Sequence, residues 1–380
     1  MQIQYIDTPE KLHDFCDQIG NAEWLALDTE FLREKTYFPQ FCLLQIATTE
    51  VVACIDPLAL DSLQPLLDIL HDTDVLKVIH SARQDMEIFY HLTGSVPAPI
   101  FDTQMAAPLL GFQENPGYAM LVSSLLNINL SKAHTRTDWS IRPLDEGQIK
   151  YAADDVIYLV EIYQKMKSKL SELGRSDWLT DDFVQLVNLD LYRPSPKNSW
   201  LRIKGRKKLT NKQLSVMQSL AEWREQTAID EDRPRNWLLR DDLIIDLARL
   251  QPENQSEMLK IRNLHERTAR RYGQALCQII LAAKNRAPIK VEEKDTRVKK
   301  IPHQEAILDL LTAVVRIRAN ENSLNPSVLA NRNALETLLV NRSESSMVQG
   351  WRAAMVGNEL VAILDGEKAI SVAGSEIVIA

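Results

Sequence analysis

The sequence predicts an α/β domain followed by two all-α domains. Short apolar runs alternate with amphipathic helical patterns as far as residue 190, which indicates strands and helices in one domain. Beyond the linker two helical blocks repeat at an offset of 91 residues, so that Leu238 matches Leu329 and Leu247 matches Leu338. A repeat of that length with helical content indicates duplicated small domains. With 380 residues, two or three domains are expected.

The charge of the chain changes at the same boundaries. Residues 1–192 carry 13 Lys and Arg against 29 Asp and Glu, residues 193–300 carry 25 against 14, and residues 301–380 carry 6 against 9. The acidic block suits a site for divalent cations, and the basic block suits a polyanion. We therefore expect an α/β domain, a basic linker, a first helical domain, a charged tether and a second, divergent helical domain, at 1–192, 193–208, 209–290, 291–302 and 303–380.

The elements of the first domain follow in order. We expect a helix over 8–19 capped by Thr8, strands over 23–30, 41–49 and 51–58 with a hairpin at Thr49–Glu50, a helix over 60–72, a strand over 75–80, a helix over 81–94 ending at Gly94, and a short strand at 100–103. Asp102 is expected to cap the helix that follows, and we leave it out of the metal set. Several helices then run to residue 190.

Three stretches place carboxylates where the fold can gather them. Asp28 and Glu30 follow a buried apolar run, and residues i and i+2 of a strand share one face. Two like charges so close call for a cation, although a solvated turn is the commoner role of such a triplet. Tyr151 and Asp155 share one helix face, whereas Asp154 is rotated by about 100° and should point elsewhere. Asp85 lies in the first turns of a helix, where a carboxylate also favours the macrodipole.

The order D-x-E, D, Y-x-x-x-D resembles the DEDD exonuclease superfamily in its tyrosine variant. The stretches DTEFLREKTYFPQFCLLQIA, FDTQMAA and RTDWSIRPLDEGQIKYAADDV are similar to ribonuclease D. This resemblance implies a ribonuclease H-like fold and two divalent cations, Mg²⁺ or Mn²⁺. Asp28 would bridge both cations, Glu30 and Asp155 would complete the first, Asp85 would hold the second, and Tyr151 would orient the attacking water.

The implied activity is 3′→5′ exonucleolytic release of nucleoside 5′-monophosphates from RNA, with tRNA precursors and other small structured RNAs carrying 3′ single-stranded tails as substrates. Both helical repeats resemble the HRDC domain shared by RecQ-type helicases and ribonuclease D. The first keeps WLLRDD at its centre, and the second has lost that Trp and most of its charge. The simplest interpretation of the second repeat is that it packs against the exonuclease domain. Recruitment of a protein partner is the other interpretation that stays open for this repeat.

A further set of residues is expected to bind substrate. His80 would line the substrate channel, and Arg136, Trp139 and Arg142 would touch phosphate or stack on a base, although a strand-end His and a helix-packing Trp are more often structural. The basic stretch 200–212, which contains no acid, would contact phosphate through Lys204, Arg206, Lys207 and Lys208.

Composition limits the compartment and the classes of protein that are expected. The four cysteines show no metal-binding spacing and indicate free thiols in a reducing compartment, so we expect a cytoplasmic protein. No apolar run approaches a membrane span, and we expect a monomer. Two other functions stay open: a DNA 3′→5′ exonuclease, because RNA preference depends on contacts to the 2′-hydroxyl, and a non-catalytic RNA-binding protein on a nuclease fold.

Overall fold

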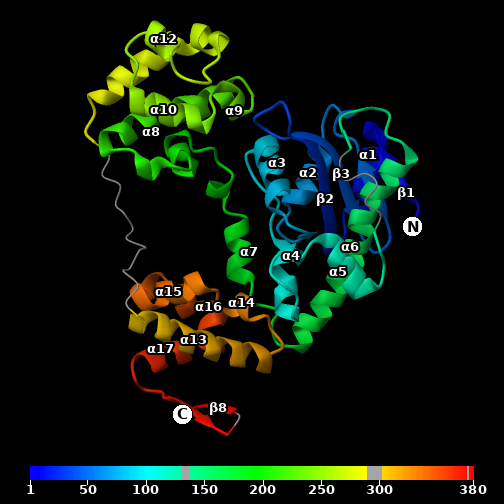
Figure 1. The fold of residues 1–380 in the computed structure, drawn as a ribbon. Helices are drawn as coiled ribbons and strands as arrows, with labels where there is room; N and C mark the ends of the chain where they lie inside the picture. The colour runs from blue at the N-terminus through cyan, green and yellow to red at the C-terminus, as the bar shows by residue number, and fades with distance from the viewer. Residues whose placement is uncertain (131–136, 289–301, 375) are drawn as a thin grey trace. The chain divides into compact units, whose positions relative to one another are not determined.

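The computed structural model describes residues 1–130, 137–288, 302–374 and 376–380 (Figure 1). The chain forms two compact units. The first contains Met1–Glu30, the described residues of Cys42–Leu191, and the described C-terminal region. The second contains Phe31–Phe41 and the described residues of Tyr192–Thr296. The short segment 31–41 therefore belongs to the helical unit, although it joins two neighbouring strands of the α/β unit.

A six-stranded sheet is the centre of the first unit, with the order β1-β4-β3-β2-β5-β6. Its strands are β1 (Ile3–Ile6), β2 (Trp24–Leu32), β3 (Gln40–Ala47), β4 (Val52–Ile55), β5 (Leu76–Ile79) and β6 (Ile100–Asp102). β3 and β4 form the expected antiparallel hairpin. β1 is parallel to β4, and β5 is parallel to both β2 and β6. The predicted α/β architecture is confirmed, with β1 as a strand that the sequence analysis missed.

Cap residues mark some of the helix ends in this domain. They are α1 (Pro9–Ile19), α2 (Gln64–His71), α3 (Arg83–Thr93), α4 (Thr103–Ala106), α5 (Tyr118–Leu126), α6 (Glu146–Glu172) and α7 (Thr180–Leu186), with a 3₁₀ turn η1 (Ala107–Leu110) after α4. Thr8 caps α1, and Gly94 ends α3 at φ 74°. Asp102 caps α4 by accepting from the N–H groups of Gln104 and Met105. These three expectations are confirmed.

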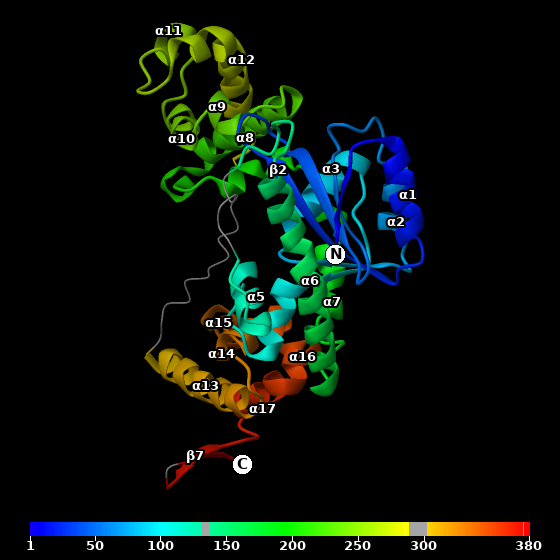
Figure 2. The same cartoon turned by 90° about the vertical axis from the view of Figure 1, so that its right-hand side faces the viewer.

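Helix α6 crosses the sheet and contacts β4, β1 and β5. Asp145 and Gln148 form a capping box that starts it. Its buried face, which includes Ala152, Val156 and Leu159, fixes the helix against the sheet. In Figure 2, α1 and α2 lie side by side away from α6. The packing of α6 against the sheet determines which turn of this helix faces the end of β2.

The second unit is helical and has its own apolar core. It contains 3₁₀ turns η3 (Pro196–Arg202) and η4 (Arg206–Lys208) and helices α8 (Asn211–Asp230), α9 (Arg235–Leu238), α10 (Asp241–Leu250), α11 (Gln255–Met258) and α12 (Glu266–Lys284). Segment 193–208, expected as a linker, contributes Trp200 and Ile203 to this core. Both side chains are apolar and are buried by α8, so much of the segment is packed structure.

The segment 31–41 is held in the second unit by hydrogen bonds. The backbone N–H groups of Tyr37 and Phe38 donate to Asp232 Oδ1, at 2.9 and 3.1 Å. The Tyr37 hydroxyl donates to Glu225 Oε1 at 2.7 Å. Glu225 is only 1% exposed, so these contacts attach the segment firmly to α8 and the turn that follows it.

The C-terminal region repeats the helices of the second unit. α13 (Pro302–Glu321), α14 (Pro326–Leu329) and α15 (Arg332–Val340) match α8, α9 and α10 at the predicted offset, and α16 (Gly350–Arg352) and α17 (Asn358–Leu364) follow. A hairpin of β7 (Ile370–Ala373) and β8 (Glu376–Ile379), not expected from the sequence, ends the chain. The expected tether 291–302 lies outside the described residues except for its last position.

The C-terminal repeat shares one apolar core with the α/β domain. Leu109, Leu121 and Met166 of that domain lie in the same buried cluster as Leu311 and Leu329 of the repeat. Trp178 and Trp351 stack at 4.9 Å between ring centroids (interplanar angle 11°). Arg175 donates to the carbonyl oxygens of Leu109 and Asn322 at 2.5 and 2.6 Å. These contacts support the packing role of the second repeat.

Candidate active site

Two of the candidate carboxylates stand on β2. Leu25, Ala26 and Leu27 are buried, and Asp28 and Glu30 follow at alternate positions, half-buried, where the strand continues. Alternation places both carboxylates on one face. The residue between them, Thr29, is 6% exposed, and its hydroxyl donates to Asp85 Oδ1. The middle residue of the triplet thus connects β2 to α3.

Asp155 of α6 completes a group of three carboxylates. Asp28, Glu30 and Asp155 each offer an oxygen atom, and these oxygens all lie within 4.8 Å of one another. Asp155 lies one helical turn after Tyr151, so the capping box and the buried face of α6 together determine its place. Asp154, which was expected to point elsewhere, is not in this group among the described residues.

Asp85 lies beside this group and is held separately. It is in the first turn of α3, 6% exposed, and accepts from Thr29. Asp102 supports the approach to this helix by accepting from the N–H groups of Ser81 and Ala82, at 3.1 and 2.9 Å. Ser81 has φ 64°, a left-handed conformation that Asp102 stabilises. The turn between β5 and α3 is thereby fixed.

The electrostatics of the four carboxyls favour a bound cation. Burial, followed by repulsion from Asp155, Asp85 and Glu30, holds the pKa of Asp28 well above its usual range. Burial, with Asp155 and Asp85, raises the pKa of Glu30 to about 8. Burial also raises the pKa of Asp85 to about 7 against the lowering effect of the Thr29 hydrogen bond, and that of Asp155 to about 7. Carboxylate oxygens are the ligands of hard divalent cations, so these residues fit a divalent metal site.

Tyr118 is a site residue that the sequence analysis missed. Its hydroxyl donates to the carbonyl oxygen of Asp155 at 2.6 Å, and its ring contacts His80 at 5.4 Å between centroids. His80 Nδ1 lies 3.0 Å from Thr103 Oγ1. His80 therefore lies in a half-buried chain of contacts that ends at Asp155. Only the fold brings α5 against this turn of α6, so no spacing signal pointed to Tyr118.

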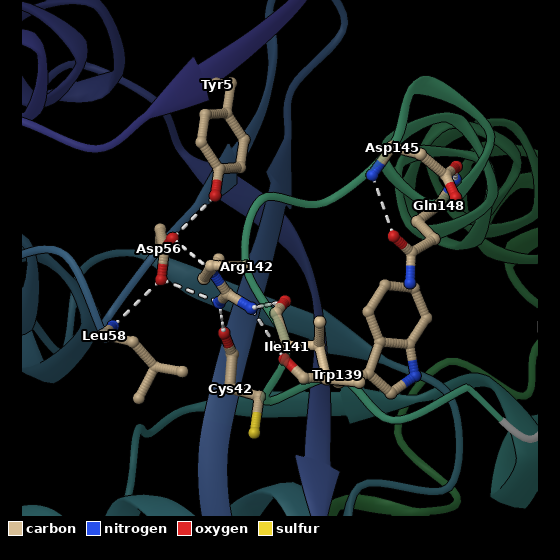
Figure 3. Close-up of polar contacts among 9 residues, drawn as sticks. All are labelled: Tyr5, Cys42, Asp56, Leu58, Trp139, Ile141, Arg142, Asp145 and Gln148. Atoms are coloured by element: carbon tan, nitrogen blue, oxygen red, sulfur yellow. Dashed lines mark hydrogen bonds and ion pairs between the residues drawn. The ribbon is translucent and has the colours of Figure 1, made fainter.

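Arg142 and Trp139 have structural contacts. Arg142 Nε donates to Asp56 Oδ2 at 2.6 Å, and Nη2 donates to Asp56 Oδ1 at 2.8 Å and to the carbonyl oxygen of Cys42 at 2.7 Å (Figure 3). Its Nη1 donates to the carbonyl oxygens of Trp139 and Ile141, at 2.7 and 2.9 Å. Trp139 is 4% exposed. These contacts favour the structural alternative for both residues.

The basic candidates of the second unit are mostly exposed. Lys204, Lys207 and Lys208 are exposed, and Arg206 is half-buried. Arg206 Nη1 donates to the carbonyl oxygen of Leu201 at 2.6 Å. Three ammonium groups therefore face solvent, as a phosphate-binding surface requires. Arg136 lies outside the described residues.

The fold and the carboxylate group define a 3′→5′ exonuclease with an added helical domain. A family model described as "3'-5' exonuclease" matches residues 3–171, and one described as "HRDC domain" matches residues 213–280. The chain is 36% identical to a Ribonuclease D of Sphingobium indicum over 98% of this chain and 97% of that one. It is 35% identical to a Ribonuclease D of Pseudomonas paraeruginosa over 96% of this chain and 98% of that one.

Among solved structures, the chain is similar to Escherichia coli RNase D, described as an exoribonuclease involved in structured RNA processing. The TM-score is 0.82 at 28% identity, covering 96% of this chain and 99% of that one. The chain belongs to the ribonuclease D family and is a 3′→5′ exoribonuclease. No helix in the described part of the chain is long and apolar enough to cross a membrane.

Proposed function

We propose that Asp28, Glu30, Asp85 and Asp155 hold two divalent cations, Mg²⁺ or Mn²⁺, at the catalytic centre. The observation that carries this proposal is the group of three carboxylates whose oxygen atoms lie within 4.8 Å of one another. Asp85 stands beside the group and is held by Thr29. This division supports Asp28, Glu30 and Asp155 as ligands of one cation, with Asp28 shared and Asp85 as ligand of the second.

In the proposed hydrolysis of the phosphodiester bond, the cations, the carboxylates and Tyr151 have different roles. Two divalent cations supply charge stabilisation for the attacking and leaving oxygens of an in-line displacement. The carboxylates would hold these cations, and a bound cation would lower the pKa values of Glu30, Asp85 and Asp155, which burial and neighbouring carboxylates raise. Tyr151 lies one turn before Asp155 on α6. We assign it the role of orienting the attacking water, because a phenol hydroxyl can both donate and accept a hydrogen bond.

The proposed substrate is RNA with a single-stranded 3′ tail, in particular a tRNA precursor or another small structured RNA. The exposed cations Lys204, Lys207 and Lys208 support contacts to phosphate in the second unit. The relative of known structure is described as acting in structured RNA processing. We propose that the protein acts as a monomer. We also propose that it acts in the cytoplasm, since its four cysteines are free thiols.

The proposed division of the chain keeps an exonuclease domain at 1–192, a basic connection at 193–208, a first HRDC domain at 209–290, a tether at 291–302 and an HRDC-like domain at 303–380. The shared core of the C-terminal repeat and the exonuclease domain supports a structural role for that repeat. Substrate binding would then belong to the first repeat.

Digestion of a 5′-labelled hairpin RNA with a 3′ tail tests this function. Wild type with Mg²⁺ or Mn²⁺ should shorten the tail from its 3′ end, and Asp155→Asn should reduce the rate by at least about 100-fold, the usual effect of losing a group that acts on the transition state. Asp154→Asn is the matched control, because its carboxylate is adjacent in sequence and outside the group. Equal loss in both variants would contradict the ligand assignment, and faster digestion of a matched DNA would contradict the RNA preference.

A further inference from the structure

Trp237 is exposed, although the two residues that follow it are buried. Its side chain is 55% exposed on α9, whereas its neighbours Leu238 and Leu239 are 3% and 1% exposed, and Leu239 belongs to the helical core. The chain has seven tryptophans, all in described residues, and the other six are buried or half-buried. An indole buries roughly 150–250 Å² when it is covered, so an exposed one marks a surface that a ligand or partner covers.

The internal repeat provides a comparison for this position. α9 and α14 are four-residue helices at the same offset in the two repeats, and Trp237 matches Val328. Val328 is 6% exposed and belongs to the core that the second repeat shares with the α/β domain. Its carbonyl oxygen also accepts from Arg352 at 3.2 Å. At the matching helix position, the second repeat therefore has a small side chain that is buried, and the first repeat has an indole that is exposed to solvent.

Two partly exposed arginines of this unit, one of them on α9, share a buried carboxylate. Arg235 Nη1 and Arg202 Nη1 each lie 3.7 Å from Glu225 Oε1, and their side chains remain 41% and 57% exposed. One buried carboxylate therefore lies between two guanidinium groups and also accepts from Tyr37. Arg240, three residues after Trp237, is 69% exposed and lies 3.3 Å from Asp242. Arg235 lies two residues before Trp237 on α9, and Arg202, which approaches the same carboxylate as Arg235, belongs to the acid-free stretch 200–212.

We propose that Trp237 is a stacking platform for an unpaired base of the RNA strand, with Arg235 and Arg202 contacting the flanking phosphates. This inference rests on the proposed function and assigns its substrate-binding surface to α9. Stacking on an indole tolerates every base, because each base has a π face. That tolerance suits an enzyme that removes nucleotides one after another. Guanidinium groups contact phosphate in forked geometry, so the indole and the arginines together recognise single-stranded nucleic acid by its two constant features.

Binding measurements on the full-length chain test the platform. In an Asp28→Asn background with EDTA, which prevents cleavage, fluorescence anisotropy measures the Kd for a 5′-labelled 12-nucleotide oligoadenylate. Trp237→Ala should weaken binding about tenfold, within the range for one stacked base, and Trp237→Phe should retain most of the affinity. Leu281→Ala is the matched control, because Leu281 is 60% exposed in the same unit and is not aromatic. It should bind as tightly as the parent.

Thermal unfolding excludes a folding defect as the cause. Trp237→Ala should keep its Tm within about 2 °C of the parent, as a surface substitution does. A Kd within twofold of the parent would overturn the platform and leave Trp237 as a contact for a protein partner. Equal losses in Trp237→Ala and Trp237→Phe would overturn stacking. If cleavage-competent wild type neither binds nor shortens the tailed RNA, the proposed function itself fails, which is a different result from a loss confined to Trp237.

Discussion

The substitution Glu30→Gln tests the electrostatic account of the site through the stability of the metal-free protein. The carboxyl of Glu30 has its pKa raised from 4.5 to about 8 by burial and by Asp155 and Asp85. A carboxyl with a raised pKa contributes stability that is fully present at low pH, below its unfolded pKa. That stability is lost as the pH rises through the folded pKa. Metal-free wild type should therefore lose stability between about pH 4.5 and pH 8.

The magnitude follows from the size of the shift. One pKa unit corresponds to about 1.4 kcal/mol. Relative to low pH, the raised pKa of Glu30 therefore lowers the free energy of unfolding by about 4 kcal/mol at pH 8 but by only about 1 kcal/mol at pH 5, where mainly the unfolded state is ionised. Gln has nearly the same shape and no charge. Without metal, Glu30→Gln should therefore be more stable than wild type, by an amount that grows with pH. In saturating Mn²⁺ the order should reverse, because Gln lacks the anionic ligand that a hard cation prefers.

Thermal unfolding monitored from pH 5 to pH 9, in EDTA and in Mn²⁺, measures both effects. The expected result is a Tm difference that rises by several degrees between pH 5 and pH 8 in EDTA. Asp154→Gln is a useful comparison, since its carboxylate lies outside the group of three. A Tm difference between Glu30→Gln and wild type that does not change with pH would refute the reasoning, as would equal stabilisation of both proteins by Mn²⁺.

Two other substitutions distinguish a residue that positions a candidate metal ligand from a residue that stabilises the fold. Tyr118→Phe removes the 2.6 Å hydrogen bond to the Asp155 carbonyl oxygen, which is worth about 1 kcal/mol; we expect about a fivefold increase in the Mn²⁺ concentration for half-maximal activity. An unchanged metal requirement with lower stability would contradict this role. Arg142→Met leaves Asp56, with a side chain 2% exposed, without its cation and should cost about 3–5 kcal/mol at pH 7, measured by urea unfolding. Burial raises the pKa of Asp56, but the hydrogen bonds from Arg142 and Tyr5 outweigh it and lower the pKa, so this loss should shrink below about pH 4. A higher KM for RNA with unchanged stability would instead favour the substrate-binding role.

Much of the secondary structure could be predicted because its signals are local. The cap at Thr8, the left-handed Gly94 and the Asp102 cap each depend on residues within a few positions. The repeat at an offset of 91 residues is also legible in the sequence, and α8 and α13 begin at exactly matching positions. β1 was missed because its partner, β4, lies about fifty residues away in sequence, and only that pairing makes Ile3–Ile6 a strand.

The candidate site also contains residues that could be predicted from the sequence and residues that could not. The triplet containing Asp28 and Glu30, and the helical spacing of Tyr151 and Asp155, could be recognised from the sequence, because strand and helix periods place side chains on a face. Tyr118 could not, since its contact with the Asp155 turn exists only when α5 packs on α6. Arg142 shows the converse. A cation near the motif was expected to reach substrate, and only the tertiary structure shows its hydrogen bonds to Asp56 and backbone carbonyl oxygens, which favour the structural alternative.

The sequence by itself determined the class of this protein, the residue types of its candidate metal site and the duplication of its helical part, because these depend on residue identity and short-range spacing. Tertiary structure decided which carboxyl oxygens lie within 4.8 Å of one another, that segment 31–41 is held by Glu225 and Asp232, and that one repeat is covered while α9 of the other exposes Trp237. The physical reason is that burial and pairing between distant segments depend on how whole elements pack, which no local pattern specifies.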